Sequence, residues 1–137
     1  MHLLFLCTGN SCRSQMAEGF ARDLAPAGIT VSSAGIEAHG QNPRAIAAMQ
    51  EVGIDITDQA SSTLSDAMLA TADVVITVCG HADEQCPILP PGVSRQHWAL
   101  PDPARAQGTE AEITATFRRV RDDIRARVAT LMTEQSA

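Results

Sequence analysis

A cysteine, a glycine and an arginine lie close together near the start of the chain, in the stretch 7–14 (CTGNSCRS). A cysteine thiolate is a strong nucleophile, and the forked guanidinium of an arginine can bind two oxygens of one tetrahedral oxyanion. Gly9 permits the tight curl in which successive backbone N–H groups point inward around an anion. The stretch therefore predicts an oxyanion-binding loop made of Thr8, Gly9, Asn10, Ser11, Cys12, Arg13 and Ser14.

Cys7 is the candidate nucleophile of this loop. The backbone N–H groups and Arg13 favour the anionic form of its sulfur, and Ser14 is placed to donate a further hydrogen bond to it. The alternative is that Cys7 is a buried apolar residue at a strand end and Arg13 a surface residue. The apolar run before the cysteine, the glycine inside the loop and the helix after it favour the catalytic interpretation.

The elements that must position the loop are short apolar runs that alternate with helical patterns. Continuous apolar runs at residues 3–6 and 74–78 are typical of strands covered on both faces, and weaker strand candidates lie at 29–34 and 96–100. This spacing leaves room for a helix after each strand.

Helix start and stop signals support that alternation. One helix is expected to begin near Arg13, and a second to run from Asn42, an N-cap followed by proline, to Gly53. The last helix begins at the capping pair Thr109 and Glu112. Its apolar residues recur at steps of three and four: Ile113, Phe117, Val120, Ile124, Val128 and Leu131.

The order of these elements predicts a single α/β domain over residues 1–137, with a parallel sheet and helices on both of its faces. In such sheets ligands bind beyond the carboxyl ends of the strands. Cys7 follows the first strand, Cys79 follows the third and Asp102 follows the last. We therefore expect these three residues to meet at one edge of the sheet.

Composition narrows the classes of partner. The chain has a net charge of −6, with ten arginines and no lysine, so its overall field repels nucleic acid and anionic membranes. The first residues have no basic leader and too short an apolar run for a signal peptide. We therefore expect a cytoplasmic protein, in which four cysteines are more often free, catalytic or metal-bound than paired in structural disulfides.

The stretch 7–14 resembles the signature of the low-molecular-weight protein tyrosine phosphatase superfamily, and residues 15–18 resemble its arsenate reductase branch. Further similar stretches are 33–37, 79–91 and 97–103. The resemblance covers nearly the whole chain. It implies a four-stranded parallel sheet in the order 2-1-3-4 and a thioredoxin-coupled arsenate reductase that serves in arsenic detoxification.

The resemblance also implies a relay of three cysteines. Cys7 attacks the arsenic of bound arsenate, and Asp102 protonates the departing hydroxide. Cys79 then attacks Cys7, so that arsenite leaves and a Cys7–Cys79 disulfide remains. Cys86 attacks Cys79, and thioredoxin reduces the Cys79–Cys86 disulfide. The implied partners are arsenate and thioredoxin, with no bound cofactor, no nucleic acid and no membrane, and we expect a monomer.

The last exchange places a condition on the segment between its two cysteines. Seven residues of an intact helix would separate Cys79 and Cys86 by about 10.5 Å along the axis, beyond the roughly 7 Å at which a disulfide can form. Gly80 and Pro87 bound the segment, which has few apolar anchors. We therefore expect a short, weakly held helix that unwinds.

A phosphatase is the nearest alternative, because phosphate fits the same loop. The resemblance implies tyrosines beside the catalytic aspartate in the phosphatases, whereas Ala104 and Arg105 follow here and the chain has no tyrosine. Cys79 and Cys86 also have no task in ester hydrolysis. The shared thiolate, loop and acid still predict a weak phosphatase side activity.

A non-catalytic alternative is a metal-binding or metal-sensing module that uses the cysteines with His81 or His97. No two cysteines have the two-residue gap typical of structural zinc sites, which argues against it. We interpret Cys12 as a packing residue, with an accidental disulfide to Cys7 as the alternative, and His39, His81 and His97 as surface or packing residues. We interpret as a solvated helix face the arginines Arg118, Arg119, Arg121, Arg125 and Arg127.

Some members of the family bind a monovalent cation near the anion loop. Asn10, Glu18 and Ser33 match three of the positions concerned, but the fourth, an aspartate in those members, is Ser62 here. We therefore expect no strong activation by potassium.

Overall fold

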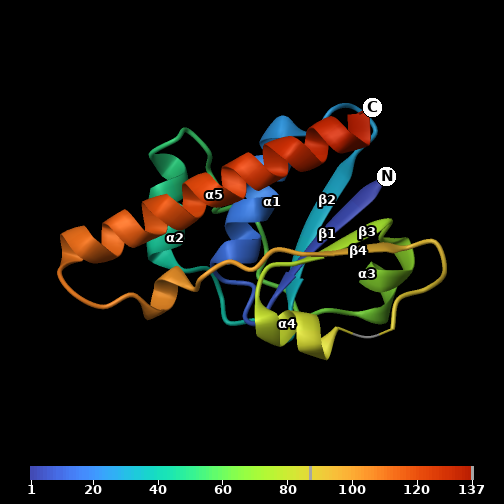
Figure 1. Ribbon diagram of the computed structural model, residues 1–137, viewed down its shortest axis with the longest axis horizontal. Coiled ribbons are helices and arrows are strands. Elements are labelled where there is room, and N and C mark those ends of the chain that lie inside the picture. The colour runs from blue at the N-terminus through green and yellow to red at the C-terminus, as the bar shows by residue number, and fades with distance from the viewer. Residues whose placement is uncertain (87, 137) are drawn as a thin grey trace.

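Four parallel strands form the centre of the computed structural model, which describes residues 1–86 and 88–136 (Figure 1). The strands are β1 (His2–Cys7), β2 (Thr30–Gly35), β3 (Val74–Thr77) and β4 (Ser94–His97). Their order in the sheet is β2-β1-β3-β4, which confirms the predicted order 2-1-3-4. Cys7 at the end of the central strand β1 pairs with Gly35, and Leu6 pairs with Thr77.

The sequence pattern predicts the fourth strand at residues 96–100, but the observed strand spans Ser94–His97. β4 pairs with β3 alone at the edge of the sheet, and three of its four side chains are exposed. Because an exposed edge strand does not need apolar residues, the apolar residues that suggested it, Trp98 and Leu100, lie beyond its end.

Helices cover both faces of the sheet, as predicted. They are α1 (Arg13–Leu24), α2 (Pro43–Gln50), α3 (Asp66–Thr71), α4 (Gly80–Gln85), α5 (Glu110–Ser136) and the short 3-10 helix η1 (Pro103–Arg105). Figure 1 shows α1, α2 and α5 on one side of the strands, α3 on the other, and α4 beyond the carboxyl ends of the strands. Within the described ranges, no helix combines the length and the apolar character required to cross a lipid bilayer.

The predicted helix caps are present. The side chain of Asn42 accepts hydrogen bonds from the backbone N–H groups of Arg44 and Ala45, at 2.8 and 3.4 Å. At the start of α5, the hydroxyl of Thr109 accepts a hydrogen bond from the N–H of Glu112, whose carboxylate accepts one in return from the N–H of Thr109. These local contacts fix where the two helices begin.

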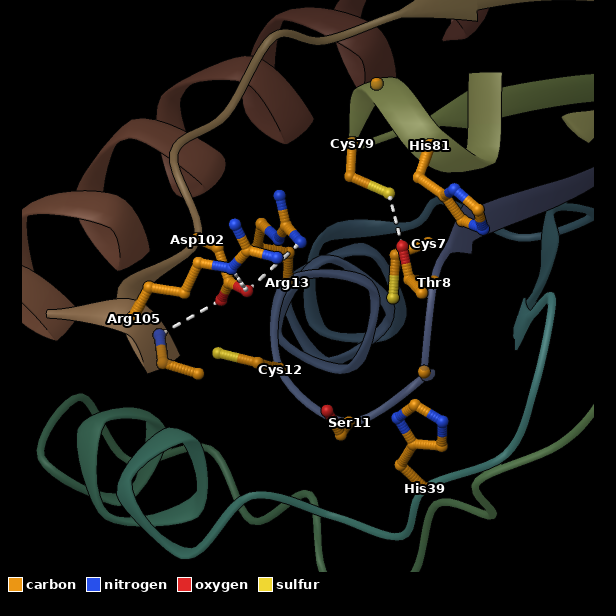
Figure 2. A pocket seen from close by; sticks show the side chains of 13 residues that line it. Cys7, Thr8, Ser11, Cys12, Arg13, His39, Cys79, His81, Asp102 and Arg105 are labelled. Atoms are coloured by element: carbon orange, nitrogen blue, oxygen red, sulfur yellow. Dashed lines mark hydrogen bonds and ion pairs between the residues drawn. The ribbon is translucent and has the colours of Figure 1, made fainter. Parts of the chain in front are cut away.

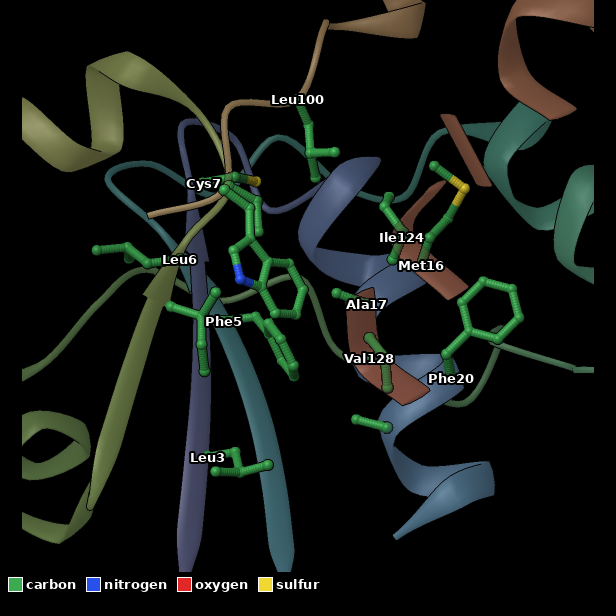
Figure 3. Close-up of a cluster of buried hydrophobic side chains, with 14 of the residues drawn as sticks. Leu3, Phe5, Leu6, Cys7, Met16, Ala17, Phe20, Leu100, Ile124 and Val128 are labelled. Atoms are coloured by element: carbon green, nitrogen blue, oxygen red, sulfur yellow. The ribbon is translucent and has the colours of Figure 1, made fainter. Parts of the chain in front are cut away.

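The core lies between β1, α1 and α5 (Figure 3). The leucine and phenylalanine side chains of residues 3–6 are all fully buried, and they belong to one buried cluster with Met16, Phe20 and Ile124 from the two helices. Because β1 has neighbours on both edges and helices on both faces, its apolar run is continuous. The end of this strand, where Cys7 lies, is therefore one of the most firmly held points in the fold.

The arginine-rich face of α5 is not simply solvated, and that interpretation is wrong for Arg121. Arg121 is buried and donates hydrogen bonds to the carbonyl of Ala48 and to the carboxylate of Glu51. Arg118 binds the same carboxylate, and hydrogen bonds from Arg118 and Arg121 hold the pKa of Glu51 at about 2. Since the long stem of an arginine can be buried while its head finds acceptors, these residues attach α5 to α2.

The burial of the core predicts that two isoleucines contribute very differently to the free energy of unfolding. Ile124→Ala leaves a cavity in the fully buried core beneath α5, so it should lower the free energy of unfolding by about 2–5 kcal/mol. Ile88 is fully exposed, and Ile88→Ala should change the same quantity by less than about 0.5 kcal/mol. Urea denaturation followed by circular dichroism measures both. Equal losses in the two variants would contradict the packing described here.

Candidate active site

The loop between β1 and α1 turns its backbone carbonyls outward. The carbonyls of Cys7, Thr8, Gly9 and Ser11 accept hydrogen bonds of 2.8–3.1 Å from backbone N–H groups in the segment 36–42 that follows β2. In a trans peptide the C=O and the next N–H point in opposite directions. The N–H groups of the loop are therefore aimed away from segment 36–42 and into the cavity beside the loop, which is the arrangement that binds an oxyanion.

Asn10 holds the curl of this loop. Its backbone adopts a left-handed conformation, with φ of +48°, which asparagine tolerates better than most residues. The side-chain carbonyl accepts a hydrogen bond of 2.7 Å from the N–H of Ser62, and the amide donates to Ser14 and Ser33 at 2.9 Å each. Because Asn10 is fully buried, these contacts are shielded from water.

Cys7 lies at the base of the cavity with only 3% of its surface exposed. Its sulfur is 2.8 Å from the hydroxyl oxygen of Ser14, as the sequence predicted. Asn10 already donates to that oxygen, which leaves the hydroxyl hydrogen of Ser14 available to the sulfur of Cys7. The chain of hydrogen bonds from Asn10 through Ser14 therefore ends at the sulfur of Cys7.

Cys12, the other cysteine of the loop, has a different environment. Its side chain is buried at the start of α1. Burial raises the pKa of the Cys12 thiol far above its ordinary value, and the negative charge of Asp102 acts in the same direction. Cys12 therefore stays a protonated thiol at neutral pH, which fits a packing role.

Arg13 and Asp102 lie together at the side of the cavity (Figure 2). The guanidinium of Arg13 donates a hydrogen bond of 3.1 Å to the carbonyl of Leu100, and it lies 3.7 Å from the carboxylate of Asp102. Asp102 also accepts a hydrogen bond of 3.0 Å from the N–H of Ala104, which caps η1. The segment after β4 thus brings the carboxylate of Asp102 to the anion loop. The guanidinium of Arg105 lies 3.8 Å from the same carboxylate.

Cys79 lies shortly after the end of β3 and is the N-cap residue of helix α4. Its buried sulfur accepts a hydrogen bond of 3.3 Å from the N–H of Ala82 and lies 3.2 Å from the hydroxyl of Thr8 (Figure 2). Cys86 caps the other end of the same helix and is half-buried. Burial raises the pKa of Cys86 above its ordinary value. The structure therefore places Cys7 and Cys79 on one cavity and keeps Cys86 a helix-length away.

The cavity has a volume of about 570 Å³ and opens at the carboxyl edge of the sheet, where the sequence predicted a site. Its lining joins the anion loop to residues that the sequence did not assign to the site: His39, Gly80, His81, Ala104 and Arg105. His39 packs against Gly9, where a side chain would overlap its ring. The sequence offered two signals for these histidines. His81 lies two residues after Cys79, and His39 lies shortly after the end of β2.

Gly35 is a second residue whose task was missed. A Cβ atom at Gly35 would overlap the carbonyl of Glu37 and would lie 2.7 Å from the N–H nitrogen of Asn10 and 2.8 Å from the carbonyl of Thr8. The end of β2 therefore approaches the anion loop too closely for any side chain. Only glycine lets segment 36–42 reach the carbonyls that it holds.

The three residues that match a cation site are in contact with one another. Ser33 donates a hydrogen bond of 2.5 Å to Glu18 and accepts one from Asn10. The second oxygen of Glu18 is 2.7 Å from the guanidinium of Arg22, which supplies a positive charge. At the fourth position, Ser62 donates its backbone N–H to the side-chain carbonyl of Asn10. Among the residues described, no three His, Cys, Asp or Glu side chains are grouped so as to hold a metal ion.

The fold and the site together define the class of protein. The sequence profile of the low molecular weight phosphotyrosine protein phosphatase family matches residues 2–137, so the chain belongs to that family. Among its relatives, an arsenate reductase from Bacillus subtilis (strain 168) is 58% identical over 122 residues, which are 89% of this chain and 88% of that one.

Solved structures agree with this placement. An arsenate reductase in a phosphate-binding state aligns with a TM-score of 0.79 and 39% identity over 97% of each chain. A thioredoxin-dependent arsenate reductase from Corynebacterium glutamicum aligns with a TM-score of 0.78 and 25% identity, over 97% of this chain and 60% of that one.

The donor chain that ends at Cys7 predicts the reactivity of its thiol. Ser14→Ala removes a hydrogen bond to a charged sulfur, so the rate of alkylation of Cys7 by iodoacetamide at pH 7 should fall about tenfold. Ser11→Ala, in the same loop, is the matched control and should stay within about twofold. Tandem mass spectrometry locates the label and separates Cys7 from Cys12. Equal rates in the two variants would show that Ser14 does not support the thiolate.

Proposed function

We propose that this protein reduces arsenate to arsenite and that Cys7, Cys79 and Cys86 carry the two electrons out of the site. One observation supports this most strongly: a second thiol, Cys79, lies at the wall of an anion-binding cavity that already holds a nucleophilic thiol. Ester hydrolysis has no use for that second thiol, whereas reduction of the substrate requires it. The relatives named arsenate reductase support the same function.

In the first step the oxyanion binds to the loop N–H groups and to Arg13, which offset the negative charge of the whole protein locally. The thiolate of Cys7 attacks arsenic and forms a sulfur–arsenic bond. The arsenic–oxygen bond opposite breaks, and Asp102 gives a proton to the departing hydroxide, which leaves as water. Arsenic is still in its oxidised state after this step.

The second step is the reduction. The thiolate of Cys79 attacks the sulfur of Cys7, the sulfur–arsenic bond breaks, and its electron pair stays with arsenic, which leaves as arsenite. A Cys7–Cys79 disulfide remains. The hydroxyl of Thr8, 3.2 Å from the sulfur of Cys79, is placed to donate a hydrogen bond to the attacking thiolate.

In the third step Cys86 attacks Cys79 and releases Cys7 as a thiolate. Because α4 holds Cys79 and Cys86 at its opposite ends, this helix has to unwind before the two sulfurs can meet. The resulting disulfide lies on an exposed segment. The proposed electron donor is thioredoxin, which reduces that disulfide by thiol exchange. One chain supplies every residue used, so we propose that the protein acts as a monomer, in the cytoplasm.

Phosphatase activity is proposed only as a side reaction. The anion loop, Cys7 and Asp102 are the groups that phosphate ester hydrolysis also needs. However, Ala104 and Arg105 follow Asp102 in the cavity lining, and the described lining contains no aromatic ring besides the two histidines that could flank a phosphotyrosine.

The cysteine relay predicts the effect of removing either later thiol. Cys79→Ser and Cys86→Ser should each lower arsenate-dependent NADPH oxidation, in an assay coupled through thioredoxin and thioredoxin reductase, by about 100-fold or more, because each variant stops the regeneration of Cys7. Glu84→Ala, in the helix between them, should stay within about twofold. Normal turnover by both cysteine variants would disprove the relay, and turnover with glutathione alone would disprove the proposed donor.

The role of Asp102 predicts a split between chemistry and binding. Asp102→Asn cannot give up a proton, so single-turnover arsenate reduction should slow by about 100-fold or more. The inhibition constant of phosphate, which reports binding at the same loop, should change by less than about threefold, because Arg13 and the loop N–H groups are still present. If phosphate binding weakens as much as the chemistry slows, Asp102 positions Arg13 and does not act as an acid.

A further inference from the structure

Helix α4 has to be folded in one state of the proposed reaction and open in another, and few contacts hold it closed. Of its six residues only Ala82 is buried. The hydrogen bond from the N–H of Ala82 to the sulfur of Cys79 caps its first turn. Among the described residues, Asp83 provides the other side-chain attachment of α4, and its carboxylate points back to the sheet.

The carboxylate of Asp83 is held by two strands. It accepts a hydrogen bond of 3.1 Å from the hydroxyl of Thr77 on β3 and one of 2.7 Å from the guanidinium of Arg95 on β4. Arg95 donates a further hydrogen bond of 2.5 Å to the backbone carbonyl of Asp83. His97 completes the group, 2.8 Å from the hydroxyl of Thr77 and 3.9 Å from the carboxylate.

These contacts depend on α4 being helical. Asp83 lies in the middle of the segment between Cys79 and Cys86. Arg95 donates hydrogen bonds to both the carboxylate and the backbone carbonyl of Asp83. A carbonyl near the end of a helix has no partner within the helix, so the bond from Arg95 satisfies a group that unwinding would move. The sheet therefore stabilises the closed helix at one residue.

The same arginine also acts on Cys86. Burial raises the pKa of the Cys86 thiol, the charge of Arg95 lowers it, and the charge of Asp83 raises it. In the closed helix the positive charge of Arg95 is paired with Asp83. Asp83 and Arg95 therefore act on the pKa of the Cys86 thiol in opposite directions while α4 is closed.

We propose that Asp83 and Arg95 form a latch that keeps α4 closed, and that release of this latch governs the attack of Cys86 on Cys79. The inference rests on the proposed function and adds two positioning residues to it. In the released state the thiolate of Cys86 bonds to the sulfur of Cys79, the Cys7–Cys79 bond breaks, and the electron pair leaves on Cys7, so no outside oxidant is needed.

The latch can be tested without arsenate in Cys7→Ser protein treated with 4,4′-dithiodipyridine. This aromatic disulfide first forms a mixed disulfide with the more exposed Cys86 and releases one thiopyridone. Cys79 then displaces the second thiopyridone, which closes the Cys79–Cys86 bond. The closing phase is independent of reagent concentration, so its rate reports how often α4 opens.

Asp83→Ala and Arg95→Ala should each speed the closing phase about fivefold, since a partly exposed ion pair makes a modest contribution. The double variant should speed closing by less than the product of the two single effects, because the ion pair between Asp83 and Arg95 is shared by both changes and can be lost only once. Arg95→Lys, which keeps the charge, should restore most of the slow closing. Glu84→Ala, an exposed neighbour on α4, is the matched control and should stay within about 1.5-fold.

Amide hydrogen exchange at residues 80–85 provides the second measurement. Faster exchange confined to this segment in Asp83→Ala supports the latch, and exchange at the parent rate overturns it. Closing rates within 1.5-fold of the parent in both single variants, or effects that multiply in the double variant, also overturn it. If the Cys7→Ser parent forms no Cys79–Cys86 bond at all, it is the proposed cysteine relay that fails, and the latch fails with it.

Discussion

The hydrogen bonds between the anion loop and the segment after β2 are the contacts on which the rest of the site depends. They turn the loop carbonyls outward and so aim the N–H groups at one point. Gly35 and the left-handed backbone of Asn10 are the local requirements for this arrangement. The arrangement explains how a protein with a net charge of −6 can bind an anion, since the positive ends of fixed dipoles act at short range where the overall field does not.

The second constraint concerns the opposite wall of the cavity. In the proposed relay, helix α4 must be stable enough to keep Cys86 apart from Cys79 and weak enough to open for the attack of Cys86 on Cys79. A helix of six residues with one buried alanine is close to that balance. Its remaining stability comes from polar contacts with β3 and β4, which can be broken and remade in water at small cost.

Much of this molecule could be predicted from its sequence because the signals are local. Buried runs at residues 3–6 and 74–78 gave the central strands, and the caps at Asn42 and Thr109 gave the helix starts. The spacing from Cys7 to Arg13 predicts a curled loop between a strand and a helix, and such a loop joins β1 to α1. These features depend on residues that are neighbours in the chain, so periodicity and spacing are sufficient to find them.

The misplaced features depend on tertiary contacts. β4 lies at an exposed edge and carries no apolar pattern, and Arg121 is buried only because α2 offers it a carbonyl and a carboxylate. The place of His39 in the cavity lining and the close approach at Gly35 likewise arise from segments that meet only in the folded chain. A single sequence gives at most an indirect signal for such contacts, such as the position of His39 shortly after a strand.

The central claim is that oxidation passes from Cys7 through Cys79 to Cys86. The most direct measurement is disulfide mapping by mass spectrometry after the reduced protein reacts with one equivalent of arsenate and is quenched in acid. The account predicts one equivalent of arsenite and a disulfide between Cys79 and Cys86, with Cys7 again a free thiol. A disulfide from Cys7 to an added small thiol, with Cys79 and Cys86 both reduced, would contradict it.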